Sequence, residues 1–302
     1  MKKFFTCGIL LILAGITYMY KNEILKGYYD FFVKKTRTVT LDSKNKYYRD
    51  YDFLYVQNTN NFEPKNKQDI LNIIYTVLNA GKDEFTFYCP VEYEDCIKDV
   101  KDIAKDQVIL SSINNYVHPF NSFNNIQTET DTLGKVKFTI YKSYTDNDIA
   151  IIEETVKNIE KEVFNENLST KDQIKEIHDY IINNSKYDSN RTDNNIIEYK
   201  SDIAYGPLIE GYGICGGYSD AMELFLEDLG IKSFKVASNS HVWNAVNLYD
   251  TWHHLDLTWD DPVTNTGEDF LDDKFFLIDT NTLQSIEQTQ HSFDINIYKE
   301  FQ

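Results

Sequence analysis

The sequence predicts an α+β protein made of a short N-terminal segment followed by two α+β domains, over residues 46–145 and 146–302. Three observations lead to this prediction. Apolar residues recur at helical spacing in several stretches, and other stretches are rich in β-branched and aromatic residues, as strands are. Six of the twelve glycines and all three tryptophans fall between Ala204 and Pro262, which makes this the chemically unusual part of the chain.

Residues 1–22 have the composition of a membrane anchor or signal segment. Lys2 and Lys3 precede an apolar run from Phe4 to Tyr20, and Lys21 ends it. The run is near the lower limit of the roughly 17–25 residues that a spanning helix needs, and no A-x-A cleavage site follows. We therefore expect a single-pass anchor in the cell membrane and a juxtamembrane linker over residues 23–45. Lysines on both flanks compete under the positive-inside rule, and we favour an extracellular catalytic domain.

The domain at 46–145 shows no catalytic constellation, so a spacer or substrate-docking role is the expectation. Its patterns predict a mixed or antiparallel sheet with helices. The expected strands are 51–56, 84–88, 123–130 and 135–144, and the expected helices are 70–78, 93–104 and 108–116.

A helix over 148–164 leads into the second domain. The next helix begins with a capping signal, Thr170 followed by Gln173, with Ser169 and Asp172 as an overlapping alternative. His178 shares the apolar face of this helix, so we interpret it as a hydrogen-bonded core residue.

The chemistry is expected at Cys215. A glycine-rich loop ending at Gly213 runs into a helical pattern that Gly230 stops, so Cys215 lies at a helix N-terminus. Unpaired backbone N–H groups and the helix dipole favour a thiolate there. The glycines on both flanks, such as Gly216 and Gly217, would let a substrate backbone approach the sulfur. The alternative is a buried structural cysteine in a tight turn.

Two strands after the helix supply the partners. Residues 241–248 and 251–259 predict an antiparallel hairpin around Tyr249 and Asp250. A two-residue loop places Trp243 opposite Asp256 and makes His241 and Asp256 diagonal neighbours on one face, about 7 Å apart at Cβ. A slip of one residue would separate them onto opposite faces. The turn residues are neither glycine nor asparagine, which weakens the case for a type I′ turn.

Cysteine on a helix, histidine on a strand and aspartate on the next strand is the order found in the transglutaminase-like fold. The chain resembles the bacterial transglutaminase-like superfamily, which has a papain-like core, over roughly residues 145–295. The motifs that carry the resemblance are Ala204-Tyr205-Gly206, Gly211-Tyr212-Gly213-Ile214-Cys215-Gly216-Gly217-Tyr218-Ser219, His241-Val242-Trp243-Asn244 and Asp256-Leu257-Thr258-Trp259-Asp260-Asp261-Pro262, with a domain-opening helix near Ile174 to Asp188.

The resemblance implies acyl transfer through a thioester. His241 would accept the Cys215 proton and return it to a leaving amine, while Asp256 would orient the imidazole. The Cys215 backbone N–H would be one oxyanion donor, and by analogy with relatives the Tyr205 phenol would be a second. In relatives the acyl donor is a peptide carboxamide or peptide bond, so the expected partner is a protein or peptide substrate. No metal or organic cofactor is required.

The other histidines are weaker candidates. His254 shares the Asp256 face on its own strand, about 7 Å away, and is the main rival of His241 as the base. His118 and His291 are expected to be structural or solvated. The last strand is expected at 275–278, with His291 in the polar tail behind it.

Charge and cysteine content exclude some functions. A formal net charge of −18 argues against nucleic acid as a partner, because phosphates demand a basic footprint. The spacing of cysteines and histidines does not suggest a zinc site. Cys89 and Cys96 either form a disulfide in an oxidising compartment or are small apolar residues of a strand and a helix. The oligomeric state is not readable from the sequence.

Two classes of function remain open at this stage. The enzyme interpretation covers transglutaminase-like cross-linking and cysteine peptidase or amidase action at the cell envelope, because the triad chemistry is the same and only the acceptor and the pocket differ. The other interpretation is a non-catalytic binding module that keeps the fold. The intact set of Cys215, His241 and Asp256 favours the enzyme.

Overall fold

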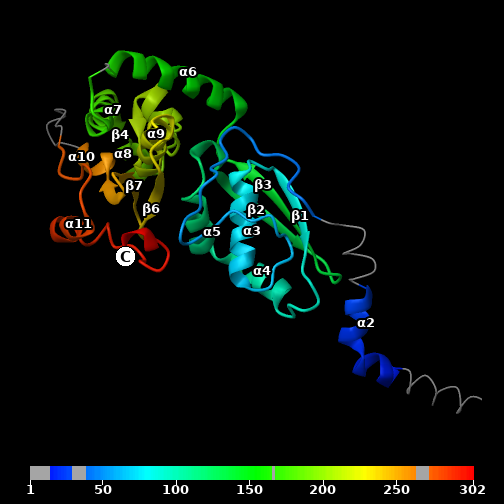
Figure 1. Ribbon diagram of the computed structural model, residues 1–302. Helices are drawn as coiled ribbons and strands as arrows, with labels where there is room; N and C mark the ends of the chain where they lie inside the picture. The colour runs from blue at the N-terminus through cyan, green and yellow to red at the C-terminus, as the bar shows by residue number, and fades with distance from the viewer. Residues whose placement is uncertain (1–13, 29–38, 165–166, 263–271) are drawn as a thin grey trace, which may run out of the picture.

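The computed structural model describes residues 14–28, 39–164, 167–262 and 272–302. This part of the chain is α+β, as the sequence predicts. Its strands form two three-stranded antiparallel sheets and one two-stranded parallel pair. The sheet of β1, β2 and β3 lies in one part of the molecule, and the other strands lie in the second part (Figure 1).

The first sheet has the strand order β1-β3-β2 and belongs to the smaller part of the molecule. Its central strand buries Val136, Phe138 and Ile140, which are the alternating apolar positions of the sequence, against the helices that cover one face (Figure 1). A disulfide between Cys89 and Cys96 joins the end of β1 to the start of α4. The elements are α3 (Lys67–Asn79), β1 (Glu84–Tyr88), α4 (Cys96–Lys105), α5 (Gln107–Asn114), η2 (Pro119–Asn121), β2 (Phe123–Thr130) and β3 (Lys135–Lys142).

The strand expected over residues 51–56 is wrong. The chain there is irregular, and its one local backbone bond runs from Phe53 N–H to the Val56 carbonyl oxygen at 3.1 Å. Phe53 and Val56 are nevertheless buried in the larger hydrophobic core. Apolar residues of a loop can pack into the core as those of a strand do, and the alternation in the sequence does not distinguish the two cases.

The second sheet has the order β6-β7-β8, and α9 packs against it beside the helices of the second part. The capping alternative at Ser169 is the one observed, since its side chain accepts the Asp172 N–H. The elements are α6 (Asp146–Val163), α7 (Thr170–Asn184), β4 (Lys186–Tyr187), α8 (Ser189–Asn194), η3 (Gly206–Glu210), β5 (Tyr212–Gly213), α9 (Cys215–Asp228), β6 (Ser233–Ala237), β7 (Val242–Leu248), β8 (Thr251–Leu255), α10 (Leu257–Asp260), α11 (Thr280–Ile286) and η4 (Lys299–Phe301).

The β7–β8 hairpin has the predicted turn and register. Tyr249 and Asp250 have φ of 54° and 61°, as both central residues of a type I′ turn require. The paired positions run from Leu248 opposite Thr251 to Asn244 opposite Leu255, which is the predicted alignment.

The hairpin is shorter than predicted. β8 stops at Leu255, and the side chain of Asp256 caps the short helix α10. The strand expected to reach Trp259 is therefore wrong beyond Leu255. The strand expected at 275–278 is reduced to one isolated bridge, between His254 and Ile278.

The two parts share a hydrophobic core and a buried ion cluster. Arg49 is fully buried and bonds to Glu223 at 2.6 Å and to Glu227 at 3.2 Å, both on α9. The C-terminal segment also bridges them, because the Tyr298 hydroxyl accepts the Ala237 N–H and an N–H of the Asn115 amide, each at 2.9 Å (Figure 1). The predicted division at residue 145 lies between the two three-stranded sheets, whose surroundings share this core and these bonds.

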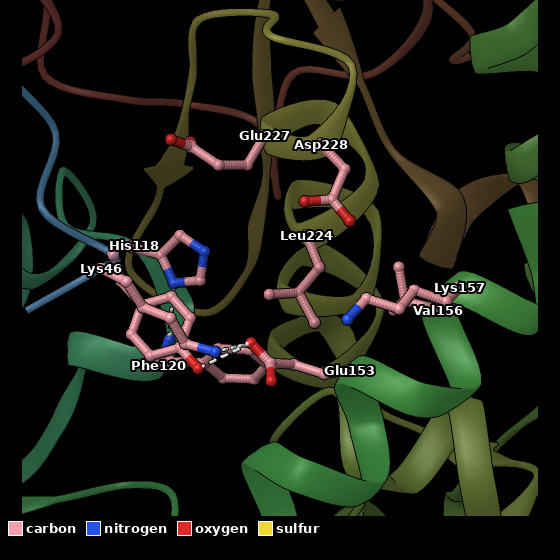
Figure 2. Close-up of a pocket in the computed structure, with 10 residues that line it drawn as sticks. Lys46, His118, Phe120, Glu153, Val156, Lys157, Leu224, Glu227 and Asp228 are labelled. Atoms are coloured by element: carbon pink, nitrogen blue, oxygen red, sulfur yellow. Dashed lines mark hydrogen bonds and ion pairs between the residues drawn. The ribbon is translucent and has the colours of Figure 1, made fainter.

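A cavity of about 290 Å³ lies where these parts meet α6 and α9 (Figure 2). Its floor is apolar, from Phe120, Val156 and Leu224, and its rim mixes charges of both signs. Glu153 accepts hydrogen bonds from Lys46 and from the Tyr47 hydroxyl across one side. The mixed rim indicates no single class of ligand.

Within the described residues, no helix has both the length and the apolar character needed to cross a bilayer. Most of the predicted span from Phe4 to Tyr20 lies outside these residues, so the anchor stays a prediction. The helix α2 covers Lys21–Tyr28, so the first residues of the expected juxtamembrane linker are helical.

Candidate active site

Cys215 is the first residue of α9 and carries a free, partly exposed thiol. The residue before it, Ile214, has extended backbone angles and gives no side-chain cap to the helix. The first N–H groups of α9 therefore have no side-chain partner at the cap, and the positive end of the helix dipole lies beside Cys215.

The glycines after the cysteine serve the packing of the helix. A Cβ atom at Gly216 would lie 2.8 Å from the Asp202 carbonyl oxygen, and one at Gly217 would lie 2.3 Å from that of Ser201. Ile214 N–H also bonds to the Ser201 carbonyl at 2.8 Å. The expectation that these glycines clear a path for substrate is thus replaced by a different role, because the backbone they admit is the protein's own.

His241 lies one residue before β7, at the end of a tight loop. Its N–H donates to the Ser238 hydroxyl at 3.1 Å, and its carbonyl accepts the Ser238 N–H at 2.9 Å. The imidazole stacks on the buried Trp243 ring, with centroids 5.8 Å apart and planes 16° apart. Backbone and ring contacts together fix the orientation of the histidine.

Asp256 is buried between β8 and α10 and uses both of its oxygens. Oδ1 accepts the N–H groups of Thr258 at 2.9 Å and Trp259 at 3.3 Å. Oδ2 accepts from His241 Nε2 at 2.6 Å and from His291 Nε2 at 2.8 Å. These four bonds fill the acceptor positions of a carboxylate.

The charges of the histidine and the carboxylate support each other. Burial alone would lower the pKa of His241, but the Asp256 charge and hydrogen bond, with a further hydrogen bond to Cys215, raise it to about 10. Burial would raise the pKa of Asp256, but the same histidine holds it below its usual range. Both directions indicate an imidazolium beside a carboxylate at neutral pH.

Cys215 and His241 line one pocket of about 250 Å³. Because Asp256 takes His241 Nε2, the other ring nitrogen, Nδ1, is left to bond the sulfur. The structure thus brings the three predicted residues together, and the arrangement suits a nucleophile, a proton carrier and an orienting group.

Comparison with known proteins agrees with this geometry. Residues 157–257 match the family model of the transglutaminase-like superfamily. The match confirms the resemblance seen in the motifs, and it contains all three residues. One similar solved structure, "Crystal structure of a TGase", is 15% identical in sequence and has a TM-score of 0.32. The aligned region covers 45% of this chain and 44% of that one. No curated protein shows a significant match.

Tyr205, the expected second oxyanion donor, is not among the described residues that line the Cys215 pocket, and its role stays a prediction. Lys200 Nζ lies 4.6 Å from the centre of the Tyr205 ring. The phenol that does line this pocket belongs to Tyr187, on the strand β4. Burial raises the pKa of Tyr187, and the nearby charge of Cys215 raises it further. Gln290 also lines the Cys215 pocket and was not singled out from the sequence.

The rival base, His254, faces away from the sulfur. Its Nδ1 accepts the Trp243 indole N–H at 3.0 Å, and its Nε2 bonds to Thr280 at 3.1 Å. Burial, helped by the charges of His291 and His253, lowers the pKa of His254 to about 3, so this ring is neutral.

Two further histidines are structural, as expected. His178 is buried and bonds to Asp179 and Asp260, and the ring of His118 is buried against Tyr47. His291, which was expected to be structural or solvated, is fully buried, and its Nε2 lies 2.8 Å from the candidate catalytic carboxylate of Asp256.

His241, Asp256 and His291 are residue types that bind metals, and their ligand atoms lie within 4.8 Å of one another. Tetrahedral zinc ligands at about 2.0–2.2 Å from the metal lie about 3.3–3.6 Å apart. The contacts of 2.6 and 2.8 Å at Asp256 Oδ2 are shorter than that and fit direct hydrogen bonds. The set is therefore arranged as a hydrogen-bonded chain.

Proposed function

We propose that the protein is a cysteine acyltransferase that forms a thioester with protein or peptide amides. The observation that carries this proposal is a free, partly exposed Cys215 at the start of α9, in one pocket with a His241 that the buried Asp256 holds at 2.6 Å. The match of residues 157–257 to the transglutaminase-like superfamily supports the same class of chemistry.

The reaction follows from the geometry. The Cys215 sulfur attacks the amide carbonyl carbon, and the backbone N–H at the start of α9 stabilises the oxyanion. His241 then donates its Nδ1 proton to the leaving nitrogen as the C–N bond breaks, which leaves a thioester and a free amine. In the second half, His241 takes a proton from the incoming amine or water, and the sulfur leaves as a thiolate. Asp256 holds the ring in place and stabilises its charged form.

Thiol labelling tests the nucleophile. We expect Cys215 to react rapidly with a small alkylating reagent at neutral pH and to react much more slowly in His241→Ala, because the imidazolium partner is lost. Labelling no faster than that of an ordinary surface thiol would leave the non-catalytic binding module as the better interpretation.

Product analysis separates the two reactions that the triad allows. The protein is incubated with a glutamine-containing peptide panel and a labelled primary amine, and the peptides are analysed by mass spectrometry. Gain of the amine identifies transamidation, whereas cleaved or deamidated peptides identify a peptidase or amidase. The absence of all these products across the panel would count against catalysis.

We further propose that the catalytic part lies outside the cell, attached to the cell membrane by its N-terminal segment. The Cys89–Cys96 disulfide supports an oxidising compartment. An impermeant thiol reagent applied to intact cells should label Cys215, and protection until the cells are opened would refute the proposed orientation.

A further inference from the structure

The C-terminal segment brings a second histidine to the candidate catalytic carboxylate. His291 Nε2 lies 2.8 Å from Asp256 Oδ2, the same oxygen that His241 approaches to 2.6 Å. The His291 side chain is 0% exposed. It lies 35 residues after Asp256, outside the region that matches the transglutaminase-like superfamily.

Glu287 fixes the position of this histidine. Its carboxylate accepts the backbone N–H groups of Thr289, Gln290 and His291, at 2.8 to 3.1 Å. It also bonds to His291 Nδ1 at 2.9 Å. The imidazole is therefore held at both nitrogens, and the turn that holds it also carries Gln290, which lines the Cys215 pocket.

Aromatic rings close the remaining sides of the imidazole. Phe275 stacks on it with centroids 5.2 Å apart and planes 15° apart, and Trp243 and Trp259 lie at 4.8 and 5.3 Å. Water is therefore kept from the Asp256–His291 contact, which strengthens the electrostatic interaction.

The two carboxylates determine the charge of His291. Burial would raise the pKa of Glu287, but hydrogen bonds from Thr289 and His291 lower it to about 2, and Asp256 is also ionised at neutral pH. Each ring nitrogen of His291 thus faces a carboxylate oxygen, at 2.9 and 2.8 Å, and donation to both oxygens would require the imidazolium.

The other titratable groups around this ring are compatible with that charge. The His241 ring centre lies 5.2 Å away, and its charge is balanced by the shared Asp256. His254 is neutral, because burial and the neighbouring His291 lower its pKa. With an imidazolium at His291, charge would alternate from Glu287 through His291 and Asp256 to His241.

We propose that His291 is a positioning residue that fixes Asp256 and offsets part of the negative charge of Asp256 that would otherwise act on His241. His241 therefore releases its proton more readily to the leaving amine. The proposal rests on the acyl-transfer function given above. Without His291, the full charge of Asp256 would fall on His241, which would bind its proton more tightly and be a weaker acid.

The charge of His291 can be read without any substrate. Nitrogen NMR of the full chain, labelled with ¹⁵N at histidine, distinguishes a doubly protonated ring from a neutral one. We expect the imidazolium signal of His291 at pH 7, assigned by its loss in His291→Gln, and a neutral ring in Glu287→Gln. A neutral His291 in the unmodified protein would overturn the proposal.

Kinetics test the effect on His241. In His291→Gln the amide keeps a donor for Asp256 but removes the charge, so we expect acyl transfer at pH 7 to slow about tenfold. The alkaline limb of the pH–rate profile, where His241 loses its proton, should move to higher pH. Glu287→Gln should move it in the same direction, because it leaves His291 neutral.

His178 provides a matched control. It is also fully buried and also lies between two carboxylates, Asp179 at 2.9 Å and Asp260 at 3.1 Å, neither of which contacts His241. His178→Gln should lower stability but leave the alkaline limb in place. A limb that stays fixed or moves to lower pH in both His291→Gln and Glu287→Gln would overturn the proposal.

The two proposals fail in different ways. An inert Cys215 with a charged His291 in the NMR spectrum would refute acyl transfer, and with it the role in proton release. A reactive Cys215 with a neutral His291 would refute only the positioning role. Should His291→Gln not fold, the alkaline limb of Glu287→Gln, compared with that of His178→Gln, still decides the question.

Discussion

Replacing Asp256 with asparagine removes a charge without changing the size of the side chain. Four donors point at this carboxylate, from His241, His291 and the backbone N–H groups of Thr258 and Trp259. Asparagine offers one acceptor oxygen, so its NH₂ group must face the donors on the other side. The variant therefore cannot accept hydrogen bonds both from the backbone N–H groups of α10 and from the two histidines.

The magnitude follows from the His241 pKa. Burial opposes the rise of this pKa, and Asp256 is the largest cause that produces it, from 6.5 to about 10. At about 1.4 kcal/mol for each pH unit, this rise is on the order of 5 kcal/mol of stabilisation of the imidazolium. Loss of most of it would leave His241 largely neutral at pH 7, and the alkylation rate of Cys215 should fall by up to about a thousandfold.

The assay is the second-order rate of Cys215 alkylation at pH 7, measured by mass spectrometry. Asp260→Asn is the matched control, because Asp260 is also fully buried but its carboxylate bonds to His178 and to the Phe275 N–H rather than to His241. We expect the control to lose stability and keep its alkylation rate. An Asp256→Asn rate within about threefold of the unmodified protein would refute the reasoning.

Three further predictions concern stability, each measured by urea unfolding. Arg49→Ala should cost about 3–5 kcal/mol because it leaves the buried Glu223 carboxylate of α9 without its cation, whereas Lys46→Ala, which removes an exposed pair, should cost less than about 1 kcal/mol; equal losses would contradict this. Replacing Cys89 and Cys96 with serine should cost about 2.5 kcal/mol, as expected for a short closed loop, and adding a reductant to the unmodified protein should reproduce the loss. Glu287→Gln should cost about 1–3 kcal/mol at pH 6. Since the folded pKa of Glu287 is lowered from 4.5 to about 2, that cost should be complete above pH 4.5 and shrink as the pH falls toward 2; a cost that grows on acidification would show the opposite sign.

Local patterns predicted the elements whose signals are local. The helix from Cys215, its stop near Gly230 and the register of β7 with β8 all follow from residues close together in the sequence. The early end of β8 also had a local signal, because Asp256 stands before a short helical stretch as an N-cap residue does. The alternation of apolar residues over 251–259 favours a longer strand and so conflicts with the signal of this cap.

The features that were missed depend on contacts between distant segments. His291 reaches Asp256 through a turn held by Glu287, and a glutamate four residues before a histidine is the only sequence signal of it. Tyr187 enters the pocket because its short strand pairs with β5, and pairs of two residues leave no periodic pattern. Such placements are decided by tertiary packing rather than by local preference.

The most direct test of the account is to isolate the acyl-enzyme. The protein is mixed with a reactive peptide amide, quenched in acid, digested and analysed by mass spectrometry. We predict that the acyl group of the peptide is found on Cys215, that an added amine discharges it, and that it does not accumulate in His241→Ala. A protein that turns over the amide while Cys215 never carries the acyl group, or that does so equally well without His241, would contradict the account.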